Sequence, residues 1–213
     1  MGKINRGILG GFSGKVGTVI GGFWNGIQYM RAVPQNVRDA KSPGQMRQRQ
    51  RLKLLSTLVK QFNTFVQIAF ENNRQGQTSG NLAYSYNLKN AFSGDYPDQE
   101  IAYDQLRVAQ GGLTGALNAS VDAIEEGEVT FSWSDNSTNG NAGPDDRVML
   151  LLINADKQES VFDTQGPKRD ESSATLTIPD SYSGDKLHAY IAFRNSDRGT
   201  VSNSTYLGTV TAT

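Results

Sequence analysis

The 213-residue sequence contains no cysteine, only one histidine and only six prolines. The absence of cysteine excludes disulfides, zinc–thiolate sites, iron–sulfur clusters and thiol catalysis. A single histidine also excludes any metal site that needs several imidazole ligands. Because these absences remove most familiar catalytic chemistries, we expect a non-enzymatic protein that has no catalytic residues and needs no cofactor.

Long apolar runs are missing as well. A membrane-spanning helix needs about 20 predominantly apolar residues, and an export signal needs about 7–15 of them after a basic start. Lys3 and Arg6 supply such a start, but glycines and Lys15 interrupt the stretch that follows, residues 7–24. We therefore expect synthesis in the cytoplasm without a signal peptide, no membrane association, and release by lysis or as part of an assembly or a virion.

Charge is balanced in total but unevenly placed along the chain. The sequence has 21 basic and 21 acidic residues, so that its formal net charge is zero. Residues 1–66 nevertheless hold eleven basic residues and one acid, a net charge of +10, whereas residues 67–213 hold ten basic and twenty acidic residues, a net charge of −10. Since each end attracts the opposite end of another molecule, this asymmetry points to a charged partner.

The glycine-dense N-terminal region contains a hairpin pattern. Two β-rich runs, Lys15–Trp24 and Ile27–Val33, flank the pair Asn25-Gly26. Asn-Gly favours a two-residue type I′ turn because both positions need a positive φ. An isolated hairpin is only marginally stable, so this one needs another surface to pack on. The predicted register places Trp24 opposite Ile27, Gly22 opposite Tyr29 and Gly21 opposite Met30.

A helix with a well-marked start is predicted next. Ser42 is the expected N-cap, Pro43 suits the first helical position, and Gln45 completes a capping box. Apolar residues then recur at helical spacing as far as Ala69. The pattern further predicts a helix end near Asn72, a second helix over residues 81–92 and an extended stretch over residues 100–109.

After the glycine-rich joint at residues 111–115, the periodicity becomes alternating. About seven short apolar runs, separated by Asn, Asp, Gly and Ser, predict an antiparallel β-sandwich similar to a fibronectin type III domain. The nearly continuous apolar run Arg147–Asn154 suits a central strand. We therefore predict an α+β protein with two domains, a basic hairpin-plus-helix region over residues 1–110 and a β-sandwich over residues 116–213.

Four stretches carry a resemblance to known proteins: GILGGFSGKVGTV at 7–19, YMR at 29–31, GDKLHAYIAF at 184–193 and VSNSTYLG at 201–208. On these residues the sequence resembles a group of small proteins widespread in Bacteroidota and classed as a domain of unknown function, and the resemblance runs nearly end to end. It implies a glycine-rich hairpin and helices in front of a β-sandwich, and it implies no activity and no site residues.

One loop has the spacing of a calcium site. Asp135, Ser137, Asn139 and Asp146 stand at positions 1, 3, 5 and 12, with Gly140 at position 6. Position 12 is normally Glu, which binds bidentately, and the flanking segments are predicted strands where an EF-hand has helices. The simpler interpretation, which we favour, is a solvated loop whose Asn and Gly residues serve its turns.

Three other features suggest catalysis or nucleotide binding only weakly. The stretch Gly10–Lys15 lacks the first glycine and the hydroxyl residue of a phosphate-binding loop. The lone His188 has no nucleophile or carboxylate tied to it by any motif, so a structural hydrogen bond is the better interpretation. Three glutamates, Glu125, Glu126 and Glu128, lie at a predicted turn without the cleft that paired catalytic carboxylates need.

The basic N-terminal region is the main candidate for a functional surface. We predict a non-enzymatic structural protein that self-assembles into a filament, ring or particle, its basic region docking head-to-tail on the acidic sandwich of a neighbour. A nucleic-acid-binding protein is the first alternative, and a phage- or surface-associated binding module is the second. The candidate interface residues are Phe23, Trp24, Tyr29, Arg31, Arg47, Arg49, Arg51 and Lys53.

Overall fold

The protein is described by a computed structural model, which covers residues 3–4, 10–24, 26–35, 39–70, 77–123, 125–195 and 197–213. The chain divides into two compact units. The N-terminal unit comprises Met1–Ser42 and Asn72–Thr78, and the sandwich unit comprises Pro43–Glu71 and Ser79–Thr213. The helices therefore share a unit with the sandwich, and residues 110–116, where the sequence suggested a boundary, lie inside it.

The N-terminal unit is a four-stranded antiparallel sheet in sequence order. Its strands are β1 (Lys3–Ile4), β2 (Phe12–Val16), β3 (Val19–Trp24) and β4 (Ile27–Ala32). Strands β3 and β4 pair in the predicted register, with Trp24 opposite Ile27. Gly26 has the positive φ that the predicted turn needs, at 82°, while Asn25 lies outside the described residues.

Two glycines of β3 are required by close approach of neighbouring groups. A Cβ atom on Gly21 would lie 2.2 Å from the carbonyl oxygen of Phe12, and one on Gly22 would lie 2.6 Å from the ring of Tyr29. In the predicted register a large side chain faces each of them, Tyr29 at Gly22 and Met30 at Gly21. Tyr29 makes the nearest contacts at Gly22, whereas Phe12 of the other neighbouring strand makes them at Gly21.

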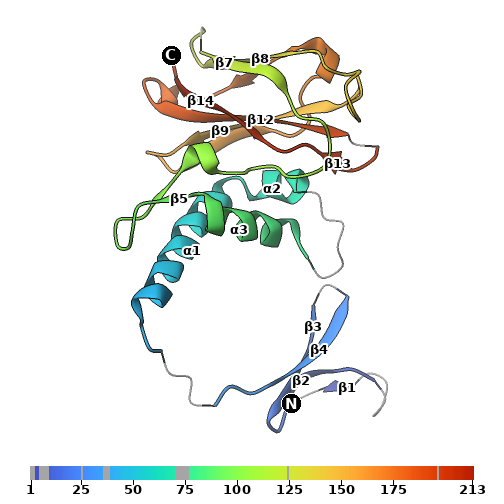
Figure 1. Cartoon of the computed structure of the whole chain (residues 1–213), viewed down its shortest axis with the longest axis vertical. Helices are drawn as coiled ribbons and strands as arrows, with labels where there is room; N and C mark the ends of the chain where they lie inside the picture. Colours follow the sequence, from blue (N-terminus) through green and yellow to red (C-terminus); the bar gives the residue numbers. More distant parts are fainter. Residues whose placement is uncertain are drawn as a thin grey trace. The chain divides into compact units, whose positions relative to one another are not determined.

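The sandwich unit has three layers (Figure 1). The strands are β5 (Phe92–Ser93), β6 (Glu100–Ile101), β7 (Leu117–Asp122), β8 (Glu128–Ser134), β9 (Arg147–Asn154), β10 (Glu159–Asp163), β11 (Ser173–Thr177), β12 (Lys186–Asn195), β13 (Thr200–Val201) and β14 (Thr205–Thr211). The central sheet has the order β10-β9-β12-β13, with β14 also paired to β12, and the outer sheet has the order β11-β8-β7. Helices α1 (Pro43–Gln61), α2 (Asn63–Ala69) and α3 (Ser79–Asn90) form the third layer.

The predicted α+β class with an antiparallel sandwich is confirmed, and the helices add a further layer. Strand β9 is buried both by the outer sheet and by this helical layer. Its side chains alternate between two separate buried clusters. Leu150 and Leu152 pack between the two sheets, whereas Leu151 and Ile153 pack beneath the helices. Because both faces of this strand are covered, its sequence is continuously apolar.

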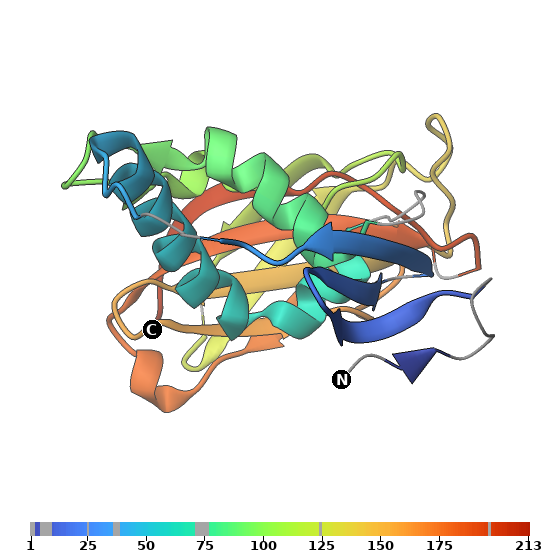
Figure 2. The same ribbon diagram turned by 90° about the horizontal axis from the view of Figure 1, so that it is seen from below.

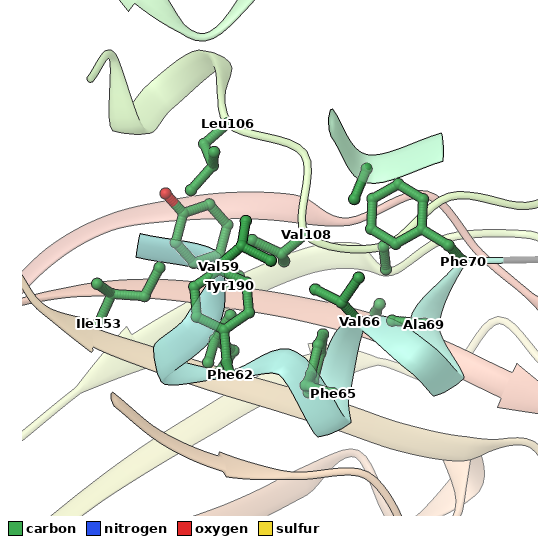
Figure 3. Packing of buried hydrophobic residues seen from close by; sticks show 14 of the residues in the cluster. Val59, Phe62, Phe65, Val66, Ala69, Phe70, Leu106, Val108, Ile153 and Tyr190 are labelled. Carbon is green, nitrogen blue, oxygen red and sulfur yellow. The ribbon is translucent and has the colours of Figure 1, made fainter. Parts of the chain in front are cut away.

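The helices lie across the outer face of the central sheet (Figure 2). Figure 3 shows Phe62 and Phe65 of the helical layer beside Ile153 and Tyr190 of the sheet. Phe62 also interrupts the single helix that the sequence predicted, since its φ of −128° and ψ of 37° are not helical. The interruption separates α1 from α2 while both keep apolar side chains in the same buried cluster. Within the described ranges, none of the helices is long and apolar enough to cross a membrane.

Candidate assembly surface

The two faces of the N-terminal sheet differ in chemistry. Residues directly opposite each other in an antiparallel pair share a face, and the face alternates along each strand. Among the described residues of these strands, the first face carries no charged residue, and it is called the uncharged face below. Among the described side chains, it consists of Phe12, Gly14, Val16, Val19, Gly21, Phe23, Gln28, Met30 and Ala32.

The second face, called the basic face below, combines cations with aromatic and aliphatic side chains. It consists of Lys3, Ser13, Lys15, Ile20, Gly22, Trp24, Ile27, Tyr29 and Arg31. Three of the predicted interface residues, Trp24, Tyr29 and Arg31, therefore lie together, whereas Phe23 lies on the opposite face. Lys15 joins this group, and the alternation of the strands could have predicted that from the sequence.

The sheet exposes side chains that most sheets bury. Phe23 is 67% exposed and Met30 is 71% exposed on the uncharged face, while Trp24 is 43% exposed and Tyr29 45% exposed on the basic face. Neither buried apolar cluster among the described residues includes a side chain of strands β1–β4. Contiguous exposed apolar surface of this kind is typical of an interaction site.

The basic residues of helix α1 divide between two environments. The guanidinium of Arg51 lies 5.3 Å from the ring centroid of Phe92, and its Nε donates to the amide oxygen of Gln99 at 2.6 Å when that amide is oriented to satisfy its neighbours. Arg51 therefore helps to hold the β5–β6 hairpin against the helix. Arg49 and Lys53 lie exposed on a different face of the helix, so only part of the predicted basic series can face a partner.

The two units differ in charge, although the cations of helix α1 belong to the sandwich unit. The N-terminal unit contains seven basic residues and one acid, a net charge of +6. The sandwich unit contains fourteen basic and twenty acidic residues, a net charge of −6. Each unit is therefore complementary in charge to the other unit of a neighbouring molecule.

The residues of the calcium-like loop serve other contacts in the structure. Asp135 accepts a hydrogen bond from the backbone N–H of Ser137 at 2.9 Å, which closes a local turn. Asp146 is fully buried, and its Oδ2 accepts from Arg169 Nε at 3.1 Å. Among the described residues, no group of three or more acidic or histidine side chains is placed to hold a metal ion.

Arg169 is the buried polar centre that the sequence did not reveal. Its guanidinium donates to Asn136 Oδ1 at 2.7 Å and to the carbonyl oxygens of Thr114 at 2.8 Å and Gly115 at 3.2 Å, in addition to Asp146. Burial lowers the pKa of this guanidinium, and the Asp146 carboxylate opposes that shift. Arg169 thereby fastens the glycine-rich joint to the calcium-like loop, and nothing in its sequence spacing signals this role.

Two aromatic residues also contact Arg169. The guanidinium carbon lies 3.8 Å from the ring centroid of Phe193, an arrangement in which the π-face stabilises a cation. Trp133 Nε1 donates to the carbonyl oxygen of Arg169 at 2.7 Å. The turn Arg169–Glu171 is thus tied to both sheets of the sandwich, and its role is structural.

The other residues that suggested catalysis or nucleotide binding also make structural contacts. The ring of His188 stacks on Tyr103 with centroids 3.8 Å apart, and its Nδ1 lies 3.0 Å from the hydroxyl of Tyr206. The carbonyl oxygen of Glu125 accepts from Thr213 Oγ1 at 2.8 Å, which ties the β7–β8 turn to the last residue. Lys15 of the phosphate-loop-like stretch lies within strand β2, so this stretch does not form a phosphate loop there.

His188 is expected to titrate below the usual pKa of about 6.5. Burial lowers the pKa of this imidazole, and the charge of Asp156 opposes the shift. Because the folded protein then binds the proton less readily than the unfolded chain, the contribution of His188 to stability is complete above about pH 6.5 and declines below it. An NMR titration of the single imidazole tests this, and a midpoint at or above that of the urea-unfolded chain contradicts it.

Comparison with known proteins gives a family and a distant structural likeness. No curated protein sequence matches the chain. Among solved structures, the fibronectin type III domain of the human collagen alpha-1(XX) chain is similar at 15% identity and a TM-score of 0.35, over 49% of this chain and 90% of that domain. The model of a family of unknown function (DUF6266) matches residues 11–208. The chain belongs to this family.

Proposed function

We propose that the protein is a non-enzymatic structural subunit that assembles with copies of itself into a filament, ring or particle. The observation that carries this proposal is the N-terminal sheet, which exposes Phe23 and Met30 on a face without charge. A monomer gains nothing from such a surface, whereas a subunit buries it against a neighbour, where apolar contact stabilises by about 25 cal/mol per Å².

Charge supports a head-to-tail arrangement of these subunits. The N-terminal unit carries +6 and the sandwich unit −6, so the basic region of one copy is attracted to the acidic sandwich of the next. Such a heterologous contact closes into a ring or continues as a filament. Its electrostatic part weakens with salt, since the Debye length falls from about 10 Å at 0.1 M to about 3 Å at 1 M.

Nucleic-acid binding is the second candidate function, and the basic face favours it. Trp24 and Tyr29 lie there beside Lys15 and Arg31, which combines stacking surfaces with cations that contact phosphates. The formal net charge of zero weighs against nucleic-acid binding, because the acidic sandwich unit repels the polymer.

The sequence resemblance supports an origin in Bacteroidota. We infer synthesis in the cytoplasm for both candidate functions, self-assembly and nucleic-acid binding.

Charge reversal on the basic face tests the docking. The double change of Lys3→Glu and Lys15→Glu reverses two exposed cations of the N-terminal unit. We expect about tenfold weaker assembly, which corresponds to about 1.4 kcal/mol, measured by light scattering during size-exclusion chromatography.

The matched control reverses Lys89 and Lys186, which are exposed cations of the sandwich unit. It has the same effect on net charge and leaves assembly unchanged or stronger if the sandwich is the acidic partner. Equal weakening by both double variants contradicts head-to-tail docking. Absorbance at 260 nm that co-purifies with the native protein and is lost in the first variant supports nucleic-acid binding in its place.

A further inference from the structure

Strand β4 is an open edge of the N-terminal sheet. Among the described residues it pairs with β3 alone, and all six of its residues are exposed. Most proteins protect such edges, because unpaired N–H and C=O groups form a template for another strand.

The hydrogen bonding of the hairpin fixes which groups face outward. The N–H of Val33 donates to the carbonyl oxygen of Thr18 at 2.8 Å, on the side of β3. Because bonded and non-bonded positions alternate in an antiparallel ladder, Ile27, Tyr29 and Arg31 also bond toward β3. The N–H and C=O groups of the residues between them therefore point away from the sheet. These outward-facing residues are Gln28, Met30 and Ala32.

Nothing within β4 blocks a further strand. Its register with β3 runs without a bulge from Ile27 to Ala32, and proline first occurs at Pro34, beyond the strand. Natural edges are commonly protected by proline, bulges or charged side chains. The single charge of this strand, Arg31, lies on the basic face.

We propose that β4 pairs antiparallel with β4 of a second copy across a two-fold axis at Met30, which joins two four-stranded sheets into one of eight strands. This pairing rests on the self-assembly proposed above but uses a different surface from the charged docking. It places Met30 opposite the partner's Met30 and Gln28 opposite the partner's Ala32. Three pairs of outward-facing residues each exchange two hydrogen bonds, six in all.

The position of the axis follows from chemistry. Opposed residues must share a face, so the axis passes through a residue and not between two. An axis at Arg31 sets two guanidinium groups directly opposite each other, which is unfavourable. An axis at Tyr29 leaves only two bonded pairs within the strand. The axis at Met30 keeps all three pairs and sets Arg31 opposite the partner's Tyr29, where a cation and an aromatic ring attract.

The same arrangement explains why a second copy fits this edge. A two-fold axis perpendicular to the sheet keeps the uncharged face of one copy continuous with the uncharged face of the other. Exposed Met30 then lies against an identical side chain, and its 71% exposed surface becomes partly covered. An isologous contact of this kind, combined with head-to-tail docking, extends an assembly in two directions.

Single-cysteine variants test the axis in a chain that has no cysteine of its own. Bonded residues in an antiparallel pair have Cα atoms about 5.5 Å apart, within the range of about 4.4–6.8 Å that a disulfide bridges. The Met30→Cys variant should therefore oxidise to a linked dimer of twice 23.2 kDa. The measurement is made under mild copper–phenanthroline oxidation in about 1 M NaCl, where docking through exposed charges is screened.

Two variants control for register and for face. Gln28→Cys places the thiols of the two copies about 14 Å apart along the strand, since they are four residues out of register at about 3.4 Å per residue. Val16→Cys places a thiol on the same uncharged face but in an internal strand. We expect both to crosslink at least about tenfold more slowly than Met30→Cys, because their thiols do not meet.

The outcomes separate this pairing from the head-to-tail proposal. Fast crosslinking of Met30→Cys alone supports the edge pairing, whether or not the charge-reversal variants still assemble. Crosslinking of Val16→Cys at the same rate, or none at Met30→Cys, overturns it. If the native protein assembles at low salt while Met30→Cys forms no disulfide-linked dimer at either salt, the edge pairing fails and the docking proposal stands.

Discussion

Replacing Asp146 by alanine is expected to destabilise the protein by about 3–5 kcal/mol, because it leaves a buried guanidinium without its counter-ion. Both side chains of the Arg169–Asp146 pair are fully buried, and their contact is 3.1 Å. The remaining acceptors of Arg169 are neutral, so they solvate the charge without balancing it. Asp146 also accepts from the N–H of Gly143 at 2.8 Å and from Asn195 at 2.8 Å, and these donors lose their acceptor as well.

The neighbouring residue offers a matched control. Asp145 pairs with Lys168 at 2.6 Å, but its side chain is 75% exposed, and such surface pairs contribute little. We expect Asp145→Ala to unfold at the same urea concentration as the native protein. The measurement is urea denaturation followed by circular dichroism, and a similar midpoint for both variants would show that Arg169 does not depend on its partner.

The second large effect is expected at the helical layer, where Leu55→Ala should cost about 2–5 kcal/mol of unfolding free energy. Leu55 of helix α1 is fully buried in the cluster that the helices share with Leu151 and Ile153 of β9. Removing its side chain leaves a cavity between the helices and the sheet, and the surrounding layers cannot fully close it.

Leu52 of the same helix is the control, since it is 50% exposed. Leu52→Ala carries the same change in helix propensity but removes far less buried surface, so we expect a loss well below that of Leu55→Ala. In a Trp24→Phe background Trp133 is the one tryptophan, so that its fluorescence reports on the unfolding of the sandwich itself. If Leu55→Ala left the Trp133 transition unchanged, the helices would not be a layer of the same cooperative unit.

Much of the fold follows from local patterns in the sequence. The apolar run Arg147–Asn154 predicts the central strand because only a strand covered on both faces is continuously apolar. The pair Asn25-Gly26 fixes the register of the hairpin, and Pro43 marks the start of helix α1. These features depend on residues close together in the chain.

Features that depend on distant residues were not predictable. Phe62 interrupts the helix at a position whose spacing still fits a continuous one. Arg169 finds its partners 23 to 55 residues away, on a loop and on the glycine-rich joint. A calcium-like spacing cannot reveal that Asp146 has turned inward to meet an arginine, since the spacing contains no information about that partner.

The candidate surface was predicted in composition but not in arrangement. The sequence identified Phe23, Trp24, Tyr29 and Arg31, and the pairing of the strands then separated Phe23 from the other three. It also suggested one basic series on helix α1, yet Arg51 packs beside Phe92 in the same molecule. Which of the predicted residues share a surface is decided by strand pairing and by side-chain packing between elements.

The molar mass of the unmodified protein in solution, measured as a function of concentration, tests the central claim most directly. Sedimentation velocity or light scattering on the full chain at low and high salt suffices. Self-assembly predicts a mass above 23.2 kDa that grows with concentration and falls in part, toward a dimer, as salt is raised. A mass of 23.2 kDa at every concentration and every salt would contradict it.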